Sequence, residues 1–248
     1  MKPCMLITGA SRGIGAATAL LAGARGYTVA VNYVHDKAAA LGVCAGIEAA
    51  GGQAFAVQAD VSNEDAVQAM FAALDARGLP LTALVNNAGV VGLVAPFVDY
   101  RAARLKRTFE VNIYGAFLVA REALKRMSTV SGGAGGAIVN LSSAAARLGS
   151  PHEFIDYAAS KGAIDSMTIG LSKEFATHGV RVNAVRPGLI DTDIHAAAGA
   201  PDRVQRLTPM IPMQRAGQAD EVAQAILWLL SDEAAYITGT FVDVSGGR

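Results

Sequence analysis

The feature that most constrains the fold of this chain is a glycine-rich turn between a short apolar segment and a helical one. Residues 5–8 are expected to form a strand, and residues 16–25 a helix. The turn between them carries Gly9, Gly13 and Gly15, which permit a tight bend and a close approach of backbone to ligand. This order of elements predicts a dinucleotide-phosphate site at the N-terminus of the helix. The alternative is a glycine-rich turn that binds nothing.

The same alternation of apolar runs and helical segments continues along the chain. Further strands are expected at 28–32, 54–57, 81–85, 137–141, 180–185 and 239–244, and further helices at 36–50, 62–76, 101–127, around 157–171 and at 220–230. Short connections between alternating strands and helices favour a parallel sheet. We therefore predict the α/β class: a single-domain, Rossmann-like, doubly wound parallel sheet with helices on both faces, spanning residues 1–248.

Charge and cysteine content exclude several classes of function. The formal net charge is zero, so nothing global favours nucleic acid or an anionic membrane surface as a partner. Cys4 and Cys44 have neither metal-ligand spacing nor a disulfide framework, so we expect no metal and a reduced, cytoplasmic setting. The apolar run before Thr8 is too short for a signal peptide or a membrane span.

Tyr157 and Lys161 are four residues apart in a segment that is expected to be helical. Residues at this spacing share one helix face, so the Lys161 ammonium can lie near the Tyr157 phenol. A fixed cation favours phenolate and lowers the phenol pKa, which makes Tyr157 a candidate proton donor to a carbonyl or acceptor from an alcohol. The alternative is a half-buried tyrosine beside a surface lysine.

The end of the second predicted strand bears on the choice of cofactor. Many dinucleotide folds place a carboxylate there to bind the adenosine ribose of NAD, but this strand ends in Asn32 and Tyr33. Arg12, in the glycine-rich turn, can pair with a 2′-phosphate. We therefore expect NADP to be favoured over NAD. The alternative is that Asn32 binds a plain ribose and that either cofactor is used.

Polar residues follow several of the other predicted strands. Asp60 follows the third strand, either as a turn residue or as a partner of the adenine amino group, and Ser62 is expected to cap the next helix. The paired asparagines of 86–89 either tie neighbouring strands or contact a ligand. Asn112 is a polar residue in an apolar helical run and needs a hydrogen-bond partner. Residues 193–212, rich in alanine and proline, are expected to form a lid.

Together these motifs resemble those of the short-chain dehydrogenase/reductase family, and the resemblance covers essentially the whole chain. The matching positions are Thr8 to Gly15 (Arg12 included), Asp60, Val61, Asn86, Asn87, Ala88, Gly89, Asn112, Ser142, Ser143, Tyr157, Lys161, Pro187, Gly188, Thr192 and the glycine-rich last strand. The resemblance implies NAD(P)-dependent interconversion of a carbonyl and a secondary alcohol.

The resemblance also implies a role for each matching residue. Tyr157 would be the general acid, Lys161 would lower its pKa and hold the nicotinamide ribose, and Asn112 would hold a water that relays protons. The cofactor contacts implied are Gly9, Ser11, Gly13, Ile14 and Gly15 at the phosphates, Asp60 and Val61 at the adenine, Asn87 near the adenosine ribose, and Ile190 and Thr192 at the nicotinamide amide.

One departure from the family pattern concerns the serine that binds the substrate oxygen. Relatives usually place it thirteen residues before the tyrosine, and that position here is Ala144. Ser143 is one residue further back, which implies one extra residue between Gly149 and Asp156. We assign the role to Ser143 and keep Ser142 as the alternative.

The family resemblance also implies a homotetramer or homodimer and a small carbonyl or alcohol substrate. Similar members include 3-oxoacyl-carrier-protein reductases and glucose-dehydrogenase-like enzymes. Lys173 matches a basic position of the carrier-protein reductases, but residues 131–136, where another basic residue is expected, carry no charge. An inactive cofactor-binding regulatory protein is the alternative from a different class.

Overall fold

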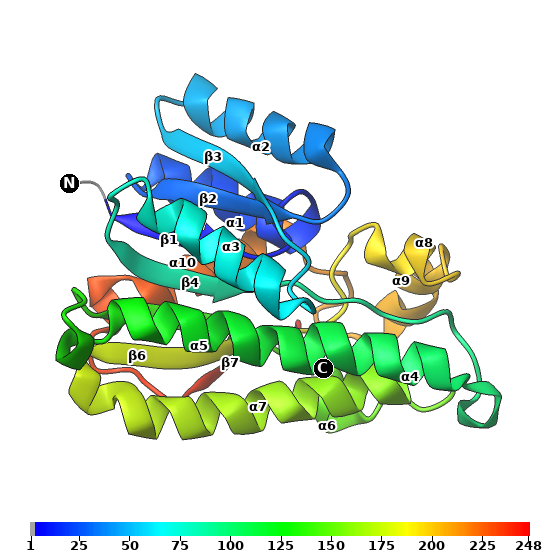
Figure 1. The fold of residues 1–248 in the computed structure, drawn as a ribbon. Coiled ribbons are helices and arrows are strands. Elements are labelled where there is room, and N and C mark those ends of the chain that lie inside the picture. The colour runs from blue at the N-terminus through cyan, green and yellow to red at the C-terminus, as the bar shows by residue number, and fades with distance from the viewer. Residues whose placement is uncertain (1–2) are drawn as a thin grey trace.

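The computed structural model describes residues 3–248, and one parallel sheet forms the centre of this part of the chain (Figure 1). Its strands are β1 (Cys4–Ile7), β2 (Thr28–Tyr33), β3 (Gln53–Gln58), β4 (Leu81–Asn86), β5 (Gly136–Leu141), β6 (Val180–Pro187) and β7 (Phe241–Val244). They lie in the order β3-β2-β1-β4-β5-β6-β7, and each neighbouring pair is parallel. The predicted doubly wound sheet is confirmed, and its order reverses between β1 and β4, where ligands bind in such folds.

Helices cover both faces of the sheet (Figure 1). They are α1 (Gly13–Ala24), α2 (Lys37–Ala49), α3 (Glu64–Asp75), α4 (Ala102–Phe109), α5 (Ala116–Met127), α6 (Ala145–Leu148), α7 (Ile155–Phe175), α8 (Ile194–Ala197), α9 (Arg203–Leu207) and α10 (Ala219–Leu230). Side chains of α1, α2 and α10 fill the core on one face, and those of α3, α5 and α7 fill the core on the other.

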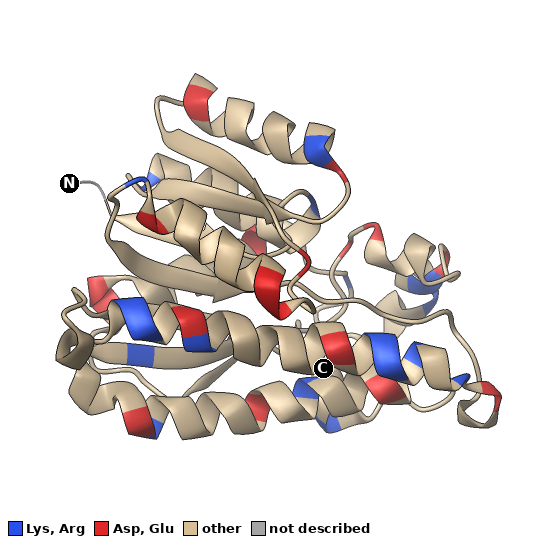
Figure 2. Ribbon diagram, in the orientation of Figure 1, with Lys and Arg blue, Asp and Glu red and all other residues tan. Residues whose placement is uncertain are grey.

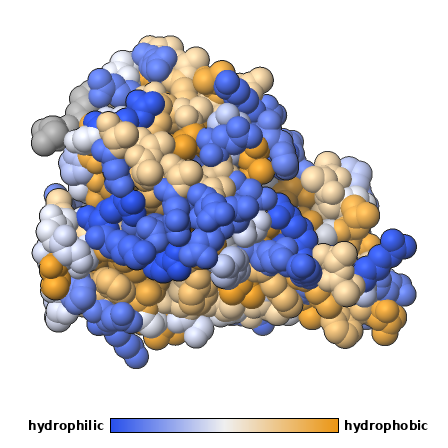
Figure 3. Space-filling view, viewed as in Figure 1, coloured by the Kyte–Doolittle hydropathy of each residue, from blue (hydrophilic) through white to orange (hydrophobic). Residues whose placement is uncertain are grey.

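The side chains of β1 show how one short strand serves both cores. Met5 and Ile7 lie in the core under α1, α2 and α10, whereas Cys4 and Leu6 lie in the core under α3 and α5. All four are buried, as expected for a central strand whose side chains alternate between two covered faces. The outer surface over α3 and α5 mixes hydrophilic and hydrophobic residues (Figure 3), and charged residues of both signs lie on α5 (Figure 2).

Two helix boundaries differ from those that the sequence predicts. Asn63 caps α3 by accepting a hydrogen bond from the Ala66 amide, so the prediction of Ser62 as the cap is wrong. Ser62 instead donates its hydroxyl to Asp60 at 2.6 Å, because the turn after β3 brings these side chains together. The predicted helix over 101–127 is interrupted by a π-helical turn at Glu110–Gly115.

Residues 193–212, predicted to form a lid, contain the short helices α8 and α9 beside the carboxyl ends of the strands (Figure 1). The Val94 amide donates a hydrogen bond to the Ala198 carbonyl at 3.0 Å, which joins this segment to the loop after β4. Arg203 of α9 forms a 2.8 Å ion pair with Glu153, just before α7. The segment is therefore attached to the loop after β4 and to the residues just before α7.

Candidate active site

The glycine-rich turn is shaped by glycines that no other residue could replace without strain or collision. Gly9 and Gly13 have φ values of 61° and 56°, in the left-handed region. A Cβ on Gly15 would lie 2.5 Å from the Gly9 carbonyl oxygen and 2.7 Å from Asn87 Nδ2. The turn therefore leaves backbone amides open at the N-terminus of α1, as a phosphate cradle requires.

Thr8 and Asn87 tie the ends of β1 and β4 together. The Thr8 hydroxyl accepts hydrogen bonds from the Asn87 and Ala88 amides, both at 2.9 Å. Asn87 Nδ2 donates in turn to the Thr8 carbonyl at 2.8 Å and to the Gly9 carbonyl at 3.0 Å. The Asn86 side chain bonds the Ala116 carbonyl. Both asparagines thus have the strand-tying contacts that the sequence suggested as one alternative.

Asn32 is fully buried, and its side chain is committed to the backbone around it. Its Oδ1 accepts from the Gly9 amide at 3.1 Å, and its Nδ2 donates to the carbonyls of Val57 and Ala59 at 3.3 and 3.1 Å. These contacts hold the glycine-rich turn in place. Both polar atoms of the Asn32 side chain are used in them, so neither is free to bind a ribose. Arg12, at the N-cap of α1, is exposed and makes no side-chain cap.

Asp60 lies at the end of the adjacent strand with its carboxylate already partnered. Oδ1 accepts from the Ser62 amide and hydroxyl, and Oδ2 pairs with Arg107 at 3.2 Å. Burial opposes ionisation, but these hydrogen bonds and the Arg107 charge hold the Asp60 pKa below its usual value. Val61 is buried against Gly115, whose Cβ would lie 2.8 Å from the valine side chain.

Asn112 lies inside the π-helical turn and is 1% exposed. Its Oδ1 accepts from the Val90 amide at 2.8 Å, and its Nδ2 donates to the Val90 carbonyl and to Ser160 Oγ. The side chain is thus satisfied by protein atoms, as a buried amide must be. Turns of this kind occur frequently at functional sites because they shift the helical hydrogen-bond register.

Lys161 is a buried cation next to Tyr157. Its Nζ lies 5.4 Å from the centroid of the Tyr157 ring and donates a hydrogen bond to the Leu141 carbonyl. Burial lowers the Lys161 pKa to about 8, and the charge of Asp165 partly offsets this fall. A Cβ on Gly89 would lie 3.7 Å from Nζ, so the loop after β4 borders the same space. The predicted proximity of Tyr157 and Lys161 is therefore present.

Burial raises the Tyr157 pKa, and this direction is opposite to the one that the sequence predicts. The nearby Ser143 hydroxyl and the positive charge of Arg203 both lower that pKa, but neither effect outweighs burial. The prediction that the Tyr157 pKa is lowered is wrong for this structure. The phenol is desolvated, and burial also shifts the Lys161 ammonium towards its neutral form.

The two serines after β5 point to different partners. Ser142 is buried and donates its hydroxyl to Asp165 Oδ1 at 2.6 Å. Ser143 instead lies near Tyr157, whose pKa it lowers, and its Oγ accepts a hydrogen bond from the Ala145 amide at 3.1 Å. Of the two, only Ser143 lies beside the tyrosine.

The segment after β6 borders the glycine-rich turn. A Cβ on Gly13 would lie 3.7 Å from Thr192 Cγ2, so these residues face each other across a narrow gap. Pro187 accepts a hydrogen bond from the Ala144 amide, and a Cβ on Gly188 would collide with the Ser245 backbone at 2.7 Å. Ile190 is buried and bridges to Gly217. The structure therefore gathers the predicted residues of the turn, the loop after β4, α7 and this segment at one edge of the sheet.

Sequence reasoning missed three ion pairs that surround this edge. Arg104 pairs with Asp156, Arg203 with Glu153, and Arg186 with Asp165. Partners up to about 50 residues apart carry no local pattern that would link them. Asp165 lies four residues after Lys161 on the same helix face, and this spacing was the one sequence signal that could have pointed to a charged group near the site.

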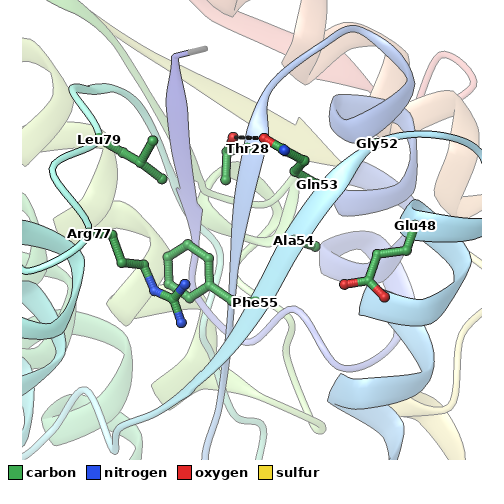
Figure 4. A pocket seen from close by; sticks show the side chains of 8 residues that line it. All are labelled: Thr28, Glu48, Gly52, Gln53, Ala54, Phe55, Arg77 and Leu79. Atoms are coloured by element: carbon green, nitrogen blue, oxygen red, sulfur yellow. Dashed lines mark hydrogen bonds between the residues drawn. The ribbon is translucent and has the colours of Figure 1, made fainter. Parts of the chain in front are cut away.

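One surface cavity lies away from this edge. It has a volume of about 500 Å³ and is found where β2 and β3 begin, beside Thr28, Gln53, Phe55 and Arg77 (Figure 4). The Arg77 guanidinium stacks 3.7 Å over the Phe55 ring. The amino ends of parallel strands are opposite to the edge that binds ligands in such folds, so this cavity is distinct from the candidate site.

Among residues 3–248, no group of three or more His, Cys, Asp or Glu side chains is arranged to hold a metal ion. No helix within the same residues has the length and apolar character needed to cross a membrane.

The fold and this cluster define a class of protein, a nicotinamide-dependent dehydrogenase with a Tyr-Lys pair. Residues 9–248 match the family model described as enoyl-(acyl carrier protein) reductase. The chain is 58% identical to an uncharacterized oxidoreductase, YgfF, of Escherichia coli (strain K12), over 98% of each chain. It is 39% identical to 3beta-hydroxysteroid dehydrogenase 1 of Eggerthella lenta, covering 98% of this chain and 92% of that one.

A solved structure agrees with these relatives. The crystal structure of a short-chain type dehydrogenase/reductase from Mycobacterium marinum superposes with a TM-score of 0.93 at 32% identity, over 99% of this chain and 94% of that one. The chain belongs to the short-chain dehydrogenase/reductase family. It is an oxidoreductase that interconverts a carbonyl and a secondary alcohol with a nicotinamide cofactor.

The residues present fit such a cofactor. The left-handed Gly9 and Gly13, the close approach of Gly15 to the Gly9 carbonyl oxygen, and the short distance between Gly13 and Thr192 form a tight turn lined by backbone. Buried Lys161 lies next to Gly89 in the loop after β4 and provides a cation at the same edge of the sheet. The turn thus suits the phosphates of a dinucleotide, and the Tyr157 and Lys161 side chains lie at the same edge.

Proposed function

We propose that Tyr157 is the general acid and base of this oxidoreductase, and that Ser143 hydrogen-bonds the substrate oxygen. The observation that carries the proposal is the position of Tyr157 near Ser143 and beside buried Lys161, whose Nζ lies 5.4 Å from the centroid of the tyrosine ring. In reduction, the Tyr157 hydroxyl donates its proton to the carbonyl oxygen while Ser143 orients that oxygen. A bound nicotinamide supplies the hydride.

Lys161 and Asn112 support this proton transfer. With a pKa of about 8, Lys161 is still mostly protonated at neutral pH and can stabilise developing phenolate. Asn112 fixes the Val90 segment and, together with Lys161, is proposed to keep a water chain to solvent. The commitment of Ser142 to Asp165 supports the choice of Ser143 over Ser142.

We propose that the cofactor is NADP(H) rather than NAD(H). Arg12 is exposed at the N-cap of α1, and no carboxylate stands at the end of β2 to repel a 2′-phosphate. The proposed cradle comprises Gly9, Ser11, Arg12, Gly13, Ile14, Gly15, Asp60, Val61, Asn87, Ala88, Gly89, Pro187, Gly188, Ile190 and Thr192. Asn32 contributes to this cradle indirectly, because its side chain holds the glycine-rich turn in place.

The proposed substrate is a small molecule with one carbonyl or secondary alcohol, and the alternatives are a 3-oxoacyl chain on a carrier protein and a sugar. An acidic carrier protein needs basic residues near the entrance, and the loop at 131–136 carries none. Leu93, Phe97 and Val98 are exposed after β4. These apolar side chains favour a nonpolar carbonyl compound over a sugar.

We propose that the protein is a homodimer or homotetramer in which α4, α5 and α7 pack against their copies. A second surface cavity, of about 950 Å³, lies on these helices. Tyr114 and Phe117 are 49% and 48% exposed there, which is costly for a monomer. Phe117→Lys should shift the mass measured by light scattering towards the monomer, and an unchanged mass would remove this face from the interface.

The single-domain organisation over 1–248 and a cytoplasmic, reducing location are also proposed. One sheet spans the described residues, and both Cys4 and Cys44 are buried free thiols. Such thiols persist where disulfides are not formed.

The test of the proposed reaction is NADPH and NADH absorbance with a panel of carbonyl compounds: an acetoacetyl thioester, a diketone, an aromatic aldehyde and a keto sugar. We expect NADPH consumption with at least one of them. Tyr157→Phe and Ser143→Ala should abolish it while leaving cofactor affinity within about twofold. Unchanged turnover in Tyr157→Phe would sink the mechanism. Cofactor binding without turnover on a broad panel would favour the regulatory alternative.

A further inference from the structure

Asp165 occupies a half-buried position on α7 that the proposed proton transfer does not use. Tyr157, Lys161 and Asp165 follow one another at intervals of four residues, so the three side chains share one face of the helix. The Asp165 side chain is 16% exposed and lies within the protein rather than at its rim. A carboxylate held there at neutral pH requires compensating partners.

Arg186 of β6 is the first of those partners. Its Nη2 donates to Asp165 Oδ2 at 2.8 Å and its Nε at 3.2 Å, and its own side chain is also 16% exposed. The guanidinium stacks 4.0 Å over the Phe241 ring of β7. The carboxylate is therefore held in one orientation by the last two strands of the sheet.

Ser142 is the second partner. Its hydroxyl lies 2.6 Å from Asp165 Oδ1 and 3.2 Å from the Lys161 carbonyl oxygen, and the Lys161 ammonium bonds the Leu141 carbonyl. These contacts fasten the end of β5 to α7. The next residue along the chain is Ser143, whose hydroxyl must stay in register with Tyr157 on the same helix.

We propose that Asp165 is a positioning residue of the carbonyl–alcohol reaction. Through Ser142 it fixes the segment that carries Ser143 against α7, and its negative charge balances the buried ammonium of Lys161. Arg186 orients the carboxylate for both tasks. The inference rests on the proposed function, because it assumes that Ser143, Tyr157 and Lys161 carry the reaction.

The charges around Lys161 agree with this assignment. Tyr157 and Asp165 face it from α7, Arg186 reaches it from β6 only through Asp165, and Arg203 of α9 acts on Tyr157. Of these groups, Asp165 is the one that raises the Lys161 pKa against burial. Loss of its charge should therefore leave less of Lys161 protonated at neutral pH.

Two substitutions separate the hydrogen bond from the charge. Asp165→Asn keeps an oxygen for Ser142 but removes the charge, whereas Ser142→Ala removes the hydroxyl and keeps the charge. The measurements are kcat and KM against pH, and the NMR titration of ¹³C-labelled Lys161 in the protein alone. Asp75→Asn, at the partly exposed pair with Arg126, is the matched control and should change none of these quantities.

For Asp165→Asn we expect kcat to fall at least about tenfold with KM within about twofold, since positioning acts on the transition state. The Lys161 titration midpoint should move down by roughly half a pH unit or more. For Ser142→Ala we expect a similar loss of kcat with no movement of that midpoint. A purely structural role would lower stability in both variants without moving the midpoint in either.

Wild-type kcat and an unmoved Lys161 midpoint in folded Asp165→Asn would overturn the proposal. If that variant does not fold, wild-type kcat in Ser142→Ala overturns it alone. The proposed function has its own test. Full turnover in Tyr157→Phe would reject it, whatever the activity of Asp165→Asn. An inactive Tyr157→Phe together with a fully active Asp165→Asn would reject only the positioning role.

Discussion

Arg104 of α4 and Asp156 at the start of α7 form a two-point ion pair next to Tyr157, the proposed general acid. Arg104 Nε donates to Asp156 Oδ2 at 2.8 Å, and Nη2 donates to Oδ1 at 2.9 Å. The carboxylate is fully buried and also accepts from the Thr108 hydroxyl at 3.1 Å. Because Asp156 precedes Tyr157, this pair fixes the first turn of α7 relative to α4.

Arg104→Ala should destabilise the protein by about 3–5 kcal/mol, because it leaves the Asp156 carboxylate buried without its cation. Urea unfolding followed by circular dichroism measures the loss. Lys106→Ala is the control: its pair with Glu110 is 3.7 Å long and exposed, so its removal should cost no more than about 0.5 kcal/mol. Equal losses of unfolding free energy in the two variants would contradict the view that the buried pair matters more than the exposed one.

Acid should destabilise the wild type more than a variant that lacks the Asp156 charge. Burial opposes ionisation of Asp156, yet the hydrogen bonds and charge of Arg104 hold its pKa below the usual value. Since the folded-state pKa is the lower one, the stabilisation is complete at neutral pH and is lost as pH falls below about 4. Thermal melts should therefore show the gap between wild type and Asp156→Asn narrowing from pH 7 to pH 3. A constant gap would count against this linkage.

Gly15→Ala should be destabilising, although alanine normally favours a helix. Its Cβ would lie 2.5 Å from the Gly9 carbonyl oxygen, a backbone atom that cannot move away, so we expect a cost of about 1–3 kcal/mol and weaker cofactor binding. Gly42→Ala in α2 is the matched control, since no atom lies within 4 Å of its Cβ position. That change should stabilise by about 0.5–1 kcal/mol. Calorimetry measures the change in stability of both variants. An unchanged stability in Gly15→Ala would show that the turn can rearrange to accept the extra methyl group.

Arg12→Ala should weaken NADPH binding at least about tenfold, because a hydrogen bond to a charged group contributes roughly 1.5–3 kcal/mol. NADH has no 2′-phosphate and provides the internal control, with an affinity expected to stay within about twofold. Fluorescence titration of both cofactors measures the difference. Equal losses would remove Arg12 as the phosphate partner.

Both thiols should be silent towards a thiol reagent at pH 8 and react only after unfolding. Burial raises the Cys4 pKa to about 11, and it also raises that of Cys44. A thiol that is neither ionised nor accessible is a poor nucleophile. Rapid reaction of the native protein would show that one of the two cores opens readily.

The sequence by itself determined the elements that depend on local pattern. The alternation of apolar runs and helical segments predicted all seven strands, and the glycines of the turn predicted its conformation. The spacing of Tyr157 and Lys161 predicted their shared face. These properties follow from the periodicities of helix and strand and from backbone sterics, which act between near neighbours.

Only the tertiary structure decided what each polar side chain does. Asn32, Asp60 and Ser142 each had a structural alternative to a ligand contact, and residues of β3, α4 and α7 that are distant in the chain give their side chains hydrogen bonds. The direction of the Tyr157 pKa shift likewise depended on burial, which is a property of the whole packed edge and not of a four-residue spacing. Hydrogen bonding and desolvation join residues that are remote in the chain, so no local pattern contains them.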